Sequence, residues 1–170
     1  KKVWCASSTH NTEEKFCGIV HKKLKKKYKN LLTIIIPRHI ERVDKIKNEI
    51  QNLNLKVHTH ESGKKIENNT DIYIVDAYGK TKTFYNYCKN VFLGGSLIVH
   101  GGQNPLEAAR YGCNILHGPN IENFTEIYNF LKKNNISQKI NNEKKMINTL
   151  NMLFQKKPNS FVLLMTPVWK

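Results

Sequence analysis

Short apolar stretches alternate with amphipathic stretches along most of this 170-residue chain. Residues 31–36 form an apolar run rich in β-branched side chains, which is typical of a parallel strand buried on both faces. Residues 43–52 carry Val43, Ile46 and Ile50 on one face, the spacing of a helix that covers a sheet. Similar patterns predict strands at 3–6, 56–60, 71–75, 90–93 and 114–116, and helices at 13–27, 81–89, 104–111, about 120–134 and 141–156. This alternation predicts an α/β fold with a doubly wound parallel sheet.

Polar or glycine-rich segments follow several of the predicted strands, namely Ser8–His10, Pro37-Arg38, 76–80 and 94–107. Right-handed crossovers bring the carboxyl ends of parallel strands to one rim of the sheet. Ligands of open α/β sheets bind at that rim, so these four segments are the candidate ligand contacts.

The segment 94–107 is the most informative of the four. It contains two glycine pairs, including Gly95 before Ser96, and then Asn104-Pro105-Leu106-Glu107. Asn104 suits a helix cap, Pro105 the first helical position, and Glu107 the first turn, where a carboxylate complements the helix dipole. A strand followed by a glycine loop and a helix start favours an anionic, nucleotide-like ligand. The structural alternative is a capped helix after a flexible loop, with Glu107 closing a capping box.

The chain is strongly basic, with a formal net charge of +15. Only Arg38, Arg42 and Arg110 of its 28 basic residues are arginine. Proteins that read bases or grip phosphates bidentately rely on arginine, so nucleic-acid binding is the less favoured interpretation. A lysine-rich surface is still attracted to anionic lipid, at roughly 1 kcal/mol per well-placed lysine. The run Lys22–Lys27 therefore indicates either a solvated helix end or a lipid contact.

Composition reduces the number of protein classes to which the chain could belong. The four cysteines are scattered, without Cys-x-x-Cys or histidine partners at metal spacing, so no metal or other cofactor is expected. No apolar run approaches the about 18 residues of a membrane span. The first residue is Lys1 rather than Met, so we expect a piece of a longer protein. Residues 1–170 are expected to form one domain, with a surface loop at 62–70. The apolar tail, 158–170, packs either on this domain or on an absent one.

Four collinear stretches resemble motifs of one glycosyltransferase family. Residues 94–107 resemble its Gly-Gly-Ser-Leu followed by Gly-Gly-His-Asn-Pro-Leu-Glu. Residues 4–14 resemble its Ala-Ser-Thr-His-Glu-Gly-Glu, residues 36–42 its Val-Pro-Arg-His-Pro-Glu-Arg, and residues 117–127 its Gly-Pro-His-Thr-Phe-Asn-Phe. The chain thus resembles the donor-binding domain of the 3-deoxy-D-manno-octulosonic acid (Kdo) transferases, which are GT-B glycosyltransferases of lipopolysaccharide synthesis.

This resemblance implies a Rossmann-like domain, the C-terminal half of a GT-B enzyme, that binds CMP-Kdo. We expect Arg38 to face the phosphate and Glu107 to accept hydrogen bonds from the ribose hydroxyls. An ion pair of Arg38 with Glu41 is the structural alternative. The full set of nucleotide contacts implied by the resemblance is Pro37, Arg38, Tyr78, Gly79, Lys80, Asn104, Pro105, Leu106 and Glu107, and further candidates are Ser8, Thr9, His10, Gly95 and Ser96.

The chain departs from the family pattern at several positions. Gln103 stands where the family has His, so no proton-transfer role is assigned there. Tyr78 and Lys80 replace Met and Glu, so only backbone contacts are expected from that segment. Asn11 and Thr12 replace Glu-Gly, which weakens the case for an anion-binding nest in that loop.

The resemblance also implies a reaction. The whole enzyme would transfer Kdo from CMP-Kdo to a lipid A precursor (lipid IVA), inverting the anomeric centre, while bound peripherally to the cytoplasmic face of the bacterial inner membrane. The general base would belong to the N-terminal GT-B domain, so no catalytic residue is expected in this chain and the chain alone should be inactive. The alternatives are a UDP-sugar transferase or epimerase of the GT-B type, a basic Rossmann-like module that binds nucleic acid, and a structural domain without a ligand.

Overall fold

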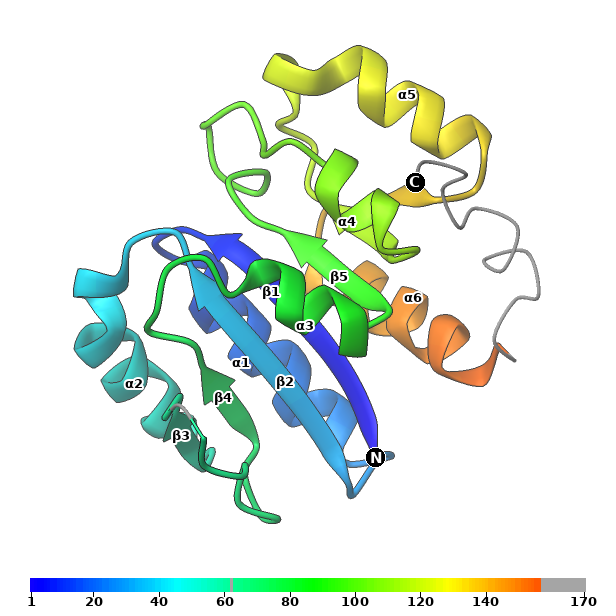
Figure 1. Ribbon diagram of the computed structural model, residues 1–170. Helices are drawn as coiled ribbons and strands as arrows, with labels where there is room; N and C mark the ends of the chain where they lie inside the picture. Colours follow the sequence, from blue (N-terminus) through cyan, green and yellow to red (C-terminus); the bar gives the residue numbers. More distant parts are fainter. Residues whose placement is uncertain (62, 157–170) are drawn as a thin grey trace.

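A computed structural model describes residues 1–61 and 63–156 of the chain. Seven parallel strands form one sheet in the order β3-β4-β2-β1-β5-β6-β7, and the strand arrows in Figure 1 run in the same direction. The strands are β1 (Lys2–Thr9), β2 (Leu31–Pro37), β3 (Val57–Thr59), β4 (Ile72–Ile74), β5 (Asn90–Leu93), β6 (Asn114–His117) and β7 (Ser137–Lys139).

Helices cover both faces of the sheet (Figure 1). One face packs against α1 (Glu13–Lys25), α2 (Val43–Gln51) and α6 (Glu143–Gln155), whose apolar side chains share a core with Trp4 and Ile35. The other face packs against α3 (Thr81–Tyr87), α4 (Leu106–Arg110) and α5 (Thr125–Lys133), around a second core that includes Cys5 and Ile34. Single 3-10 turns, η1 (Ile40–Arg42) and η2 (Glu122–Phe124), precede α2 and α5. The predicted doubly wound parallel sheet is confirmed.

The strand order reverses direction at β1. This strand pairs with β2 on one side and with β5 on the other, while the chain passes through β2, β3 and β4 before it returns to β5. The crevice between the carboxyl ends of β1 and β5 is therefore the topological switch point, where α/β sheets bind their ligands. All seven residues of β2 are buried, as its apolar sequence predicts for a strand next to the centre.

Strand β7 was not predicted from the sequence. Its residues Ser137, Gln138 and Lys139 are polar and only Ser137 is buried, because β7 lies at the edge and pairs with β6 alone. Several predicted helices are also shorter at their ends: α1 stops at Lys25 and α3 at Tyr87. The described part of the predicted loop 62–70 contains no helix or strand. The tail 158–170 lies outside the described residues.

Candidate functional site

A pocket of about 430 Å³ lies at the switch point. Ser8 and Leu93 border it from the ends of β1 and β5, and the two short helices α3 and α4 form its other walls. Its lining residues are Ser8, Thr81, Tyr85, Leu93, Gln103, Asn104, Leu106, Glu107 and Arg110. A smaller hollow of about 290 Å³, lined by Lys1, Lys2, Tyr28 and Asn30, lies at the opposite end of the sheet, away from the predicted contacts.

One side of the pocket is apolar and fixed. Tyr85 and Leu93 are buried. The Tyr85 hydroxyl donates a hydrogen bond to Ser7 Oγ at 2.8 Å, and burial raises the pKa of Tyr85 above its usual range. The phenol therefore stays neutral and its position is set by β1. This wall offers a ligand an aromatic and aliphatic surface.

Glu107 supplies the acidic group of the pocket. Its Oε2 accepts a hydrogen bond from the Thr81 hydroxyl at 3.2 Å, and its Oε1 lies 3.8 Å from Lys82 Nζ. Both partners belong to α3, so α3 orients a carboxylate that remains 42% exposed toward solvent. No capping-box bond from Glu107 to the Asn104 N–H is present in the described part of the chain.

The cap residue of α4 is Pro105, one residue after the predicted cap Asn104. The Asn104 side chain still binds the start of the helix, because its Oδ1 accepts a hydrogen bond from the Leu106 N–H at 3.0 Å. The helix itself begins at Leu106, one residue later than the position predicted for Pro105. Pro105 is buried and is not among the residues that line the pocket.

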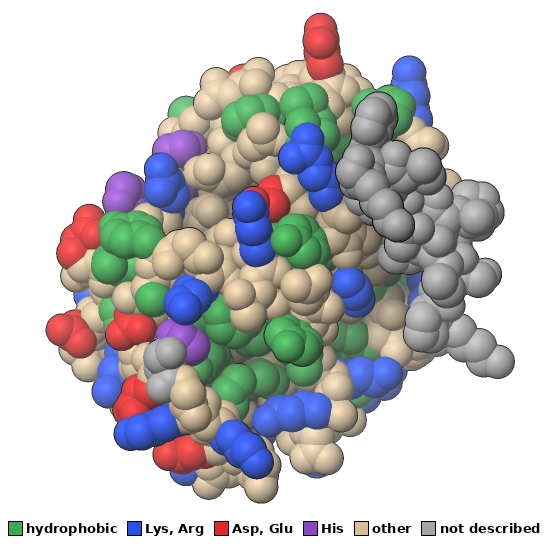
Figure 2. Space-filling view, in the orientation of Figure 1, with side chains coloured by type: hydrophobic (Ala, Val, Ile, Leu, Met, Phe, Trp, Pro, Cys, Tyr) green, Lys and Arg blue, Asp and Glu red, His purple; other side chains and the backbone are tan. Residues whose placement is uncertain are grey.

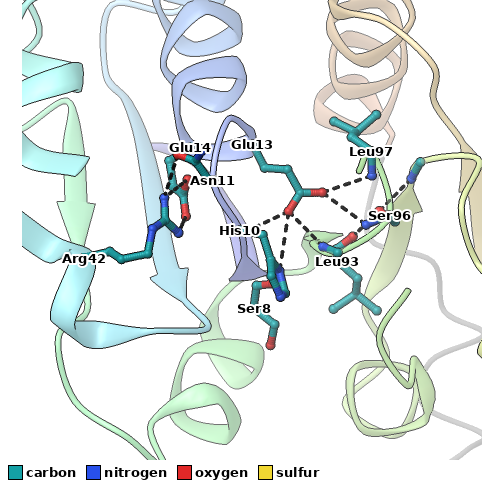
Figure 3. A network of polar contacts seen from close by, with 11 residues as sticks. Ser8, His10, Asn11, Glu13, Glu14, Arg42, Leu93, Ser96 and Leu97 are labelled. Atoms are coloured by element: carbon teal, nitrogen blue, oxygen red, sulfur yellow. Dashed lines mark hydrogen bonds and ion pairs between the residues drawn. The ribbon is translucent and has the colours of Figure 1, made fainter. Parts of the chain in front are cut away.

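The glycine loop after β5 is held by a carboxylate to which the sequence had assigned no role. Glu13, at the start of α1, is 1% exposed. Its Oε2 accepts hydrogen bonds from the N–H groups of His10 (2.9 Å) and Gly95 (2.8 Å), and its Oε1 from those of Ser96 (3.1 Å) and Leu97 (3.0 Å) (Figure 3). The amides of Gly95 and Ser96 thus already have an anionic partner inside the chain.

A second buried carboxylate anchors the segment after β2. Arg42 donates to both oxygens of Glu14, at 2.9 and 3.1 Å, and to Asn11 Oδ1 at 3.3 Å (Figure 3). Glu14 is fully buried, so this bidentate pair ties α1 firmly to the turn before α2. Sequence reasoning missed it, because nothing in the local pattern of either segment indicates the partner.

Three histidine rings lie close together at the rim, and two of them, His10 and His100, lie beside Gly95. The ring of His10 lies 4.3 Å from that of His100 and 5.8 Å from that of His39, measured between centroids. Burial and the neighbouring His100 lower the pKa of His10, while Glu13 opposes this shift. A Cβ at Gly95 would lie 3.1 to 3.3 Å from the side chains of Gln103, His100 and His10. Because Gly95 has no side chain, the side chains of Gln103, His100 and His10 can lie close to its backbone.

The other predicted contacts lie outside the pocket. Pro37 is buried at the end of β2, and the N–H of Arg38 donates to the Thr9 carbonyl at 3.0 Å. The Arg38 side chain is exposed, and in the described chain Glu41 lies near His39 (3.6 Å) rather than near Arg38. Tyr78, Gly79 and Lys80 form the turn before α3, with Tyr78 and Gly79 exposed. The structure thus gathers Ser8, Asn104, Leu106 and Glu107 around one pocket, and places the 37–38 and 78–80 segments after β2 and β4.

The described residues contain few groups that suit metal, thiol or membrane-spanning roles. Residues 1–61 and 63–156 contain no group of three His, Cys, Asp or Glu side chains arranged to hold a metal ion. The four cysteines are free and buried, and burial raises the pKa of each thiol. None of the helices in these residues is both long and apolar enough to cross a membrane.

Comparisons with known proteins point to one family. The 3-deoxy-D-manno-octulosonic acid transferase of Haemophilus influenzae is 32% identical over 124 residues, which cover 73% of this chain and 29% of that protein. The enzyme of the same name from Rickettsia prowazekii is 34% identical over 158 residues, covering 90% of this chain and 33% of that protein. The chain thus spans about a third of the length of these relatives. No family model matches the chain.

Comparison with solved structures points to the same family. The crystal structure of the C-terminal CMP-Kdo binding domain of WaaA from Acinetobacter baumannii has a TM-score of 0.87 and 26% identity, over 97% of this chain and 86% of that one. The molybdenum cofactor carrier protein of Chlamydomonas reinhardtii, at 9% identity and a TM-score of 0.57, shares the fold alone.

The doubly wound sheet with its pocket at the switch point places the chain among Rossmann-like domains, as the C-terminal half of a GT-B glycosyltransferase. Within that class the chain belongs to the Kdo transferase family, and the part of the family that it resembles is the C-terminal domain.

Proposed function

We propose that this chain binds CMP-Kdo at the switch-point pocket and serves as the sugar-donor domain of an enzyme that transfers Kdo to a lipid A precursor. The observation that carries this proposal is the oriented carboxylate of Glu107 in a half-apolar pocket at the rim, in a domain that closely matches a CMP-Kdo binding domain. The pocket has the volume and the mixed lining that suit a small ligand with apolar and polar parts.

Each predicted residue has a place in this proposal. Glu107 accepts hydrogen bonds from the ribose hydroxyls, because Oε2 accepts only one hydrogen bond, from Thr81, and Oε1 lies 3.8 Å from Lys82 Nζ. Arg38 supplies the phosphate cation, since its guanidinium is exposed. Pro37 at the end of β2, the backbone of 78–80 after β4 and the buried Pro105 complete the site, while Asn104 and Leu106 border the pocket.

The further candidates divide into two groups. Ser8 lines the pocket, Thr9 has a buried hydroxyl without a hydrogen-bond partner in the described residues, and His10 faces the other two rim histidines. These three stay in the proposed site. Gly95 and Ser96 are left out, because their amides are bound by Glu13.

The reaction itself belongs to a larger protein in this proposal. Breaking the bond between Kdo and CMP leaves negative charge on the phosphate, which cations at the rim stabilise. An N-terminal domain would supply the general base and would bind the lipid A precursor, which is the acceptor, through most of its contacts. The reaction between the two domains would invert the anomeric carbon. The excess of lysine favours peripheral binding to an anionic membrane, which we place at the cytoplasmic face of the inner membrane.

The visible surface does not favour the nucleic-acid alternative. On the face shown in Figure 2, Lys and Arg side chains are spread among acidic and apolar ones rather than joined into one track. Nucleic-acid binding depends on a continuous basic path along which phosphates lie.

Nuclear magnetic resonance can test the proposal on this chain. CMP and UMP are titrated separately into the ¹⁵N-labelled protein, and amide shifts are followed. We expect CMP to move the amide signals of Arg38, Gly79, Asn104, Leu106 and Glu107 at lower concentration than UMP does. A response to UMP at lower concentration than to CMP would favour a UDP-sugar enzyme. A response to RNA without one to CMP would favour the nucleic-acid module, and no response at millimolar CMP would contradict a preformed donor site.

A further inference from the structure

Arg110 is a pocket residue that neither the sequence motifs nor the proposed function assigns. It lies on α4, three residues after Glu107, and borders the same pocket. Residues at this spacing on a helix lie on one side, with their Cβ atoms about 5–6 Å apart. The two side chains therefore offer opposite charges, one turn apart, to whatever fills the pocket.

The guanidinium of Arg110 is uncommitted among the described residues. No ion pair or side-chain hydrogen bond of Arg110 is found there, whereas Arg42 is paired with Glu14. Arginine is rare in this chain, since only three of its 28 basic residues are of this type. An exposed lysine would serve as well if solubility were the only requirement. An arginine differs from a lysine by its planar guanidinium, which offers a pair of parallel N–H donors.

The lining of the pocket matches a nucleoside more closely than a phosphate. Leu93, Leu106 and the ring of Tyr85 form an apolar wall suited to the face of a base. Glu107, with Thr81, offers acceptors for ribose hydroxyls. When the ribose lies at Glu107 and the base against the apolar wall, the polar edge of the base comes within reach of Arg110.

We propose that Arg110 reads the base edge of the nucleotide and so selects cytosine over uracil, an inference that rests on the proposed nucleotide-binding function. Cytosine presents two adjacent acceptors, O2 and N3, which match two parallel guanidinium N–H donors. Uracil carries a hydrogen on N3, so one donor of Arg110 would face another donor. A bidentate contact of this kind discriminates between bases, whereas a contact to phosphate does not.

The test separates the base from the phosphate by using nucleosides as well as nucleotides. Affinities of cytidine, uridine, CMP and UMP are measured by chemical-shift titration for the native chain, Arg110→Ala and Arg110→Lys. Lys133→Ala, which removes another exposed positive charge, at the end of α5, is the matched control. Thermal unfolding of each variant establishes that the fold is intact.

We expect Arg110→Ala and Arg110→Lys each to weaken cytidine and CMP binding about tenfold while uridine and UMP change little, so that the cytosine preference is lost. Lys133→Ala should retain the preference. Equal weakening of CMP and UMP with unchanged nucleoside binding would show a phosphate contact and overturn the inference. An unchanged cytosine preference would overturn it too, while leaving the proposed function intact. Failure of the native chain to bind any cytidine ligand would instead reject both.

Discussion

The carboxylate of Glu13 accepts a hydrogen bond from the Gly95 N–H at 2.8 Å across 82 residues of sequence. Three more backbone amides, those of His10, Ser96 and Leu97, bind the same buried carboxylate. The glycine loop at the rim of the sheet is therefore shaped by the first residue of α1. An anion-binding loop in this fold can be satisfied from within the protein, and its glycines do not by themselves mark a ligand.

Replacing Glu13 tests this relationship. In Glu13→Gln an NH₂ group takes the place of one oxygen and faces backbone N–H donors. Because buried amides then lack acceptors, we expect the free energy of unfolding to fall by about 2–3 kcal/mol in urea denaturation. Glu126→Gln, at an exposed site in α5, should change it by less than about 0.5 kcal/mol. Equal effects of the two substitutions would mean that the carboxylate does not hold the loop.

Thr12 stores backbone strain just before α1. Its φ is 77°, it is exposed, and its side chain makes no capping hydrogen bond. The related motif has glycine at this position, which adopts such a φ without strain. We expect Thr12→Gly to raise the free energy of unfolding by roughly 0.5–1 kcal/mol, because relief of strain exceeds the added chain entropy.

Thr125→Gly is the matched control for that change. Thr125 begins α5 with a φ of −52°, so glycine there relieves nothing. It should lower stability by about 0.5–1 kcal/mol. A loss of stability in Thr12→Gly would show that Thr12 is not strained.

Gly94 marks the closest approach of β5 to β1. A Cβ at this position would lie 2.4 Å from the Ser8 carbonyl oxygen and 2.6 Å from Thr9 Cα, both backbone atoms. We expect Gly94→Ala to lower the free energy of unfolding by more than about 2 kcal/mol, because the strands must separate. Gly63→Ala is the control, since Gly63 has a positive φ of 79° but no neighbour within 4 Å among the residues that the structure describes. A loss in Gly94→Ala no larger than in the control would contradict the close approach.

The buried side chain of His21 should make the protein sensitive to acid. Its Nδ1 lies 2.8 Å from the Thr33 hydroxyl and its Nε2 3.4 Å from Asp71 Oδ1. Burial lowers its pKa to about 4, against the favourable influence of Asp71. A lowered pKa means that the unfolded chain takes up a proton near pH 6.5 and the folded chain does not. The contribution of neutral His21 to the free energy of unfolding is therefore complete above pH 6.5 and is lost as the pH falls toward 4.

The expected loss through His21 over that window is about 3 kcal/mol. His21→Asn keeps a polar partner for Thr33 but does not titrate, so its free energy of unfolding should fall less between pH 7 and pH 4.5. Urea denaturation at several pH values measures both curves. Parallel curves for the two proteins would exclude His21 as the titrating group.

Glu107 should govern recognition of the ribose. Glu107→Gln replaces one acceptor oxygen by a donor, so we expect CMP to bind about tenfold more weakly. The loss should be much smaller for 2′-deoxy-CMP, which lacks one of the hydroxyls. Titration of both nucleotides into the native chain, the variant and Glu126→Gln measures this. Equal losses for the two nucleotides would place the ribose elsewhere.

Much of the fold could be predicted, because local patterns carry it. The apolar run of β2 and the one-sided spacing of α2 correspond to buried positions in the structure. Strand β7 could not be predicted, since a polar edge strand is defined by its hydrogen bonds to β6 rather than by burial. Helix α4 begins one residue later than its turn residues predict, with Pro105 rather than Asn104 as the cap residue, although Asn104 Oδ1 accepts a hydrogen bond from the Leu106 N–H.

The sequence by itself determined the parallel sheet, the rim on which Arg38 and Glu107 lie, and the family to which those motifs point. Each depends on residues close together in the chain, where spacing, turn residues and helix caps act directly. Only the tertiary structure decided that Glu13 fills the glycine loop, that Arg42 belongs to Glu14, and that Arg110 faces the same pocket as Glu107. In each of these relationships, groups from different parts of the chain come together in the fold. Whether they meet depends on how the elements pack, and no periodic pattern in the sequence indicates it.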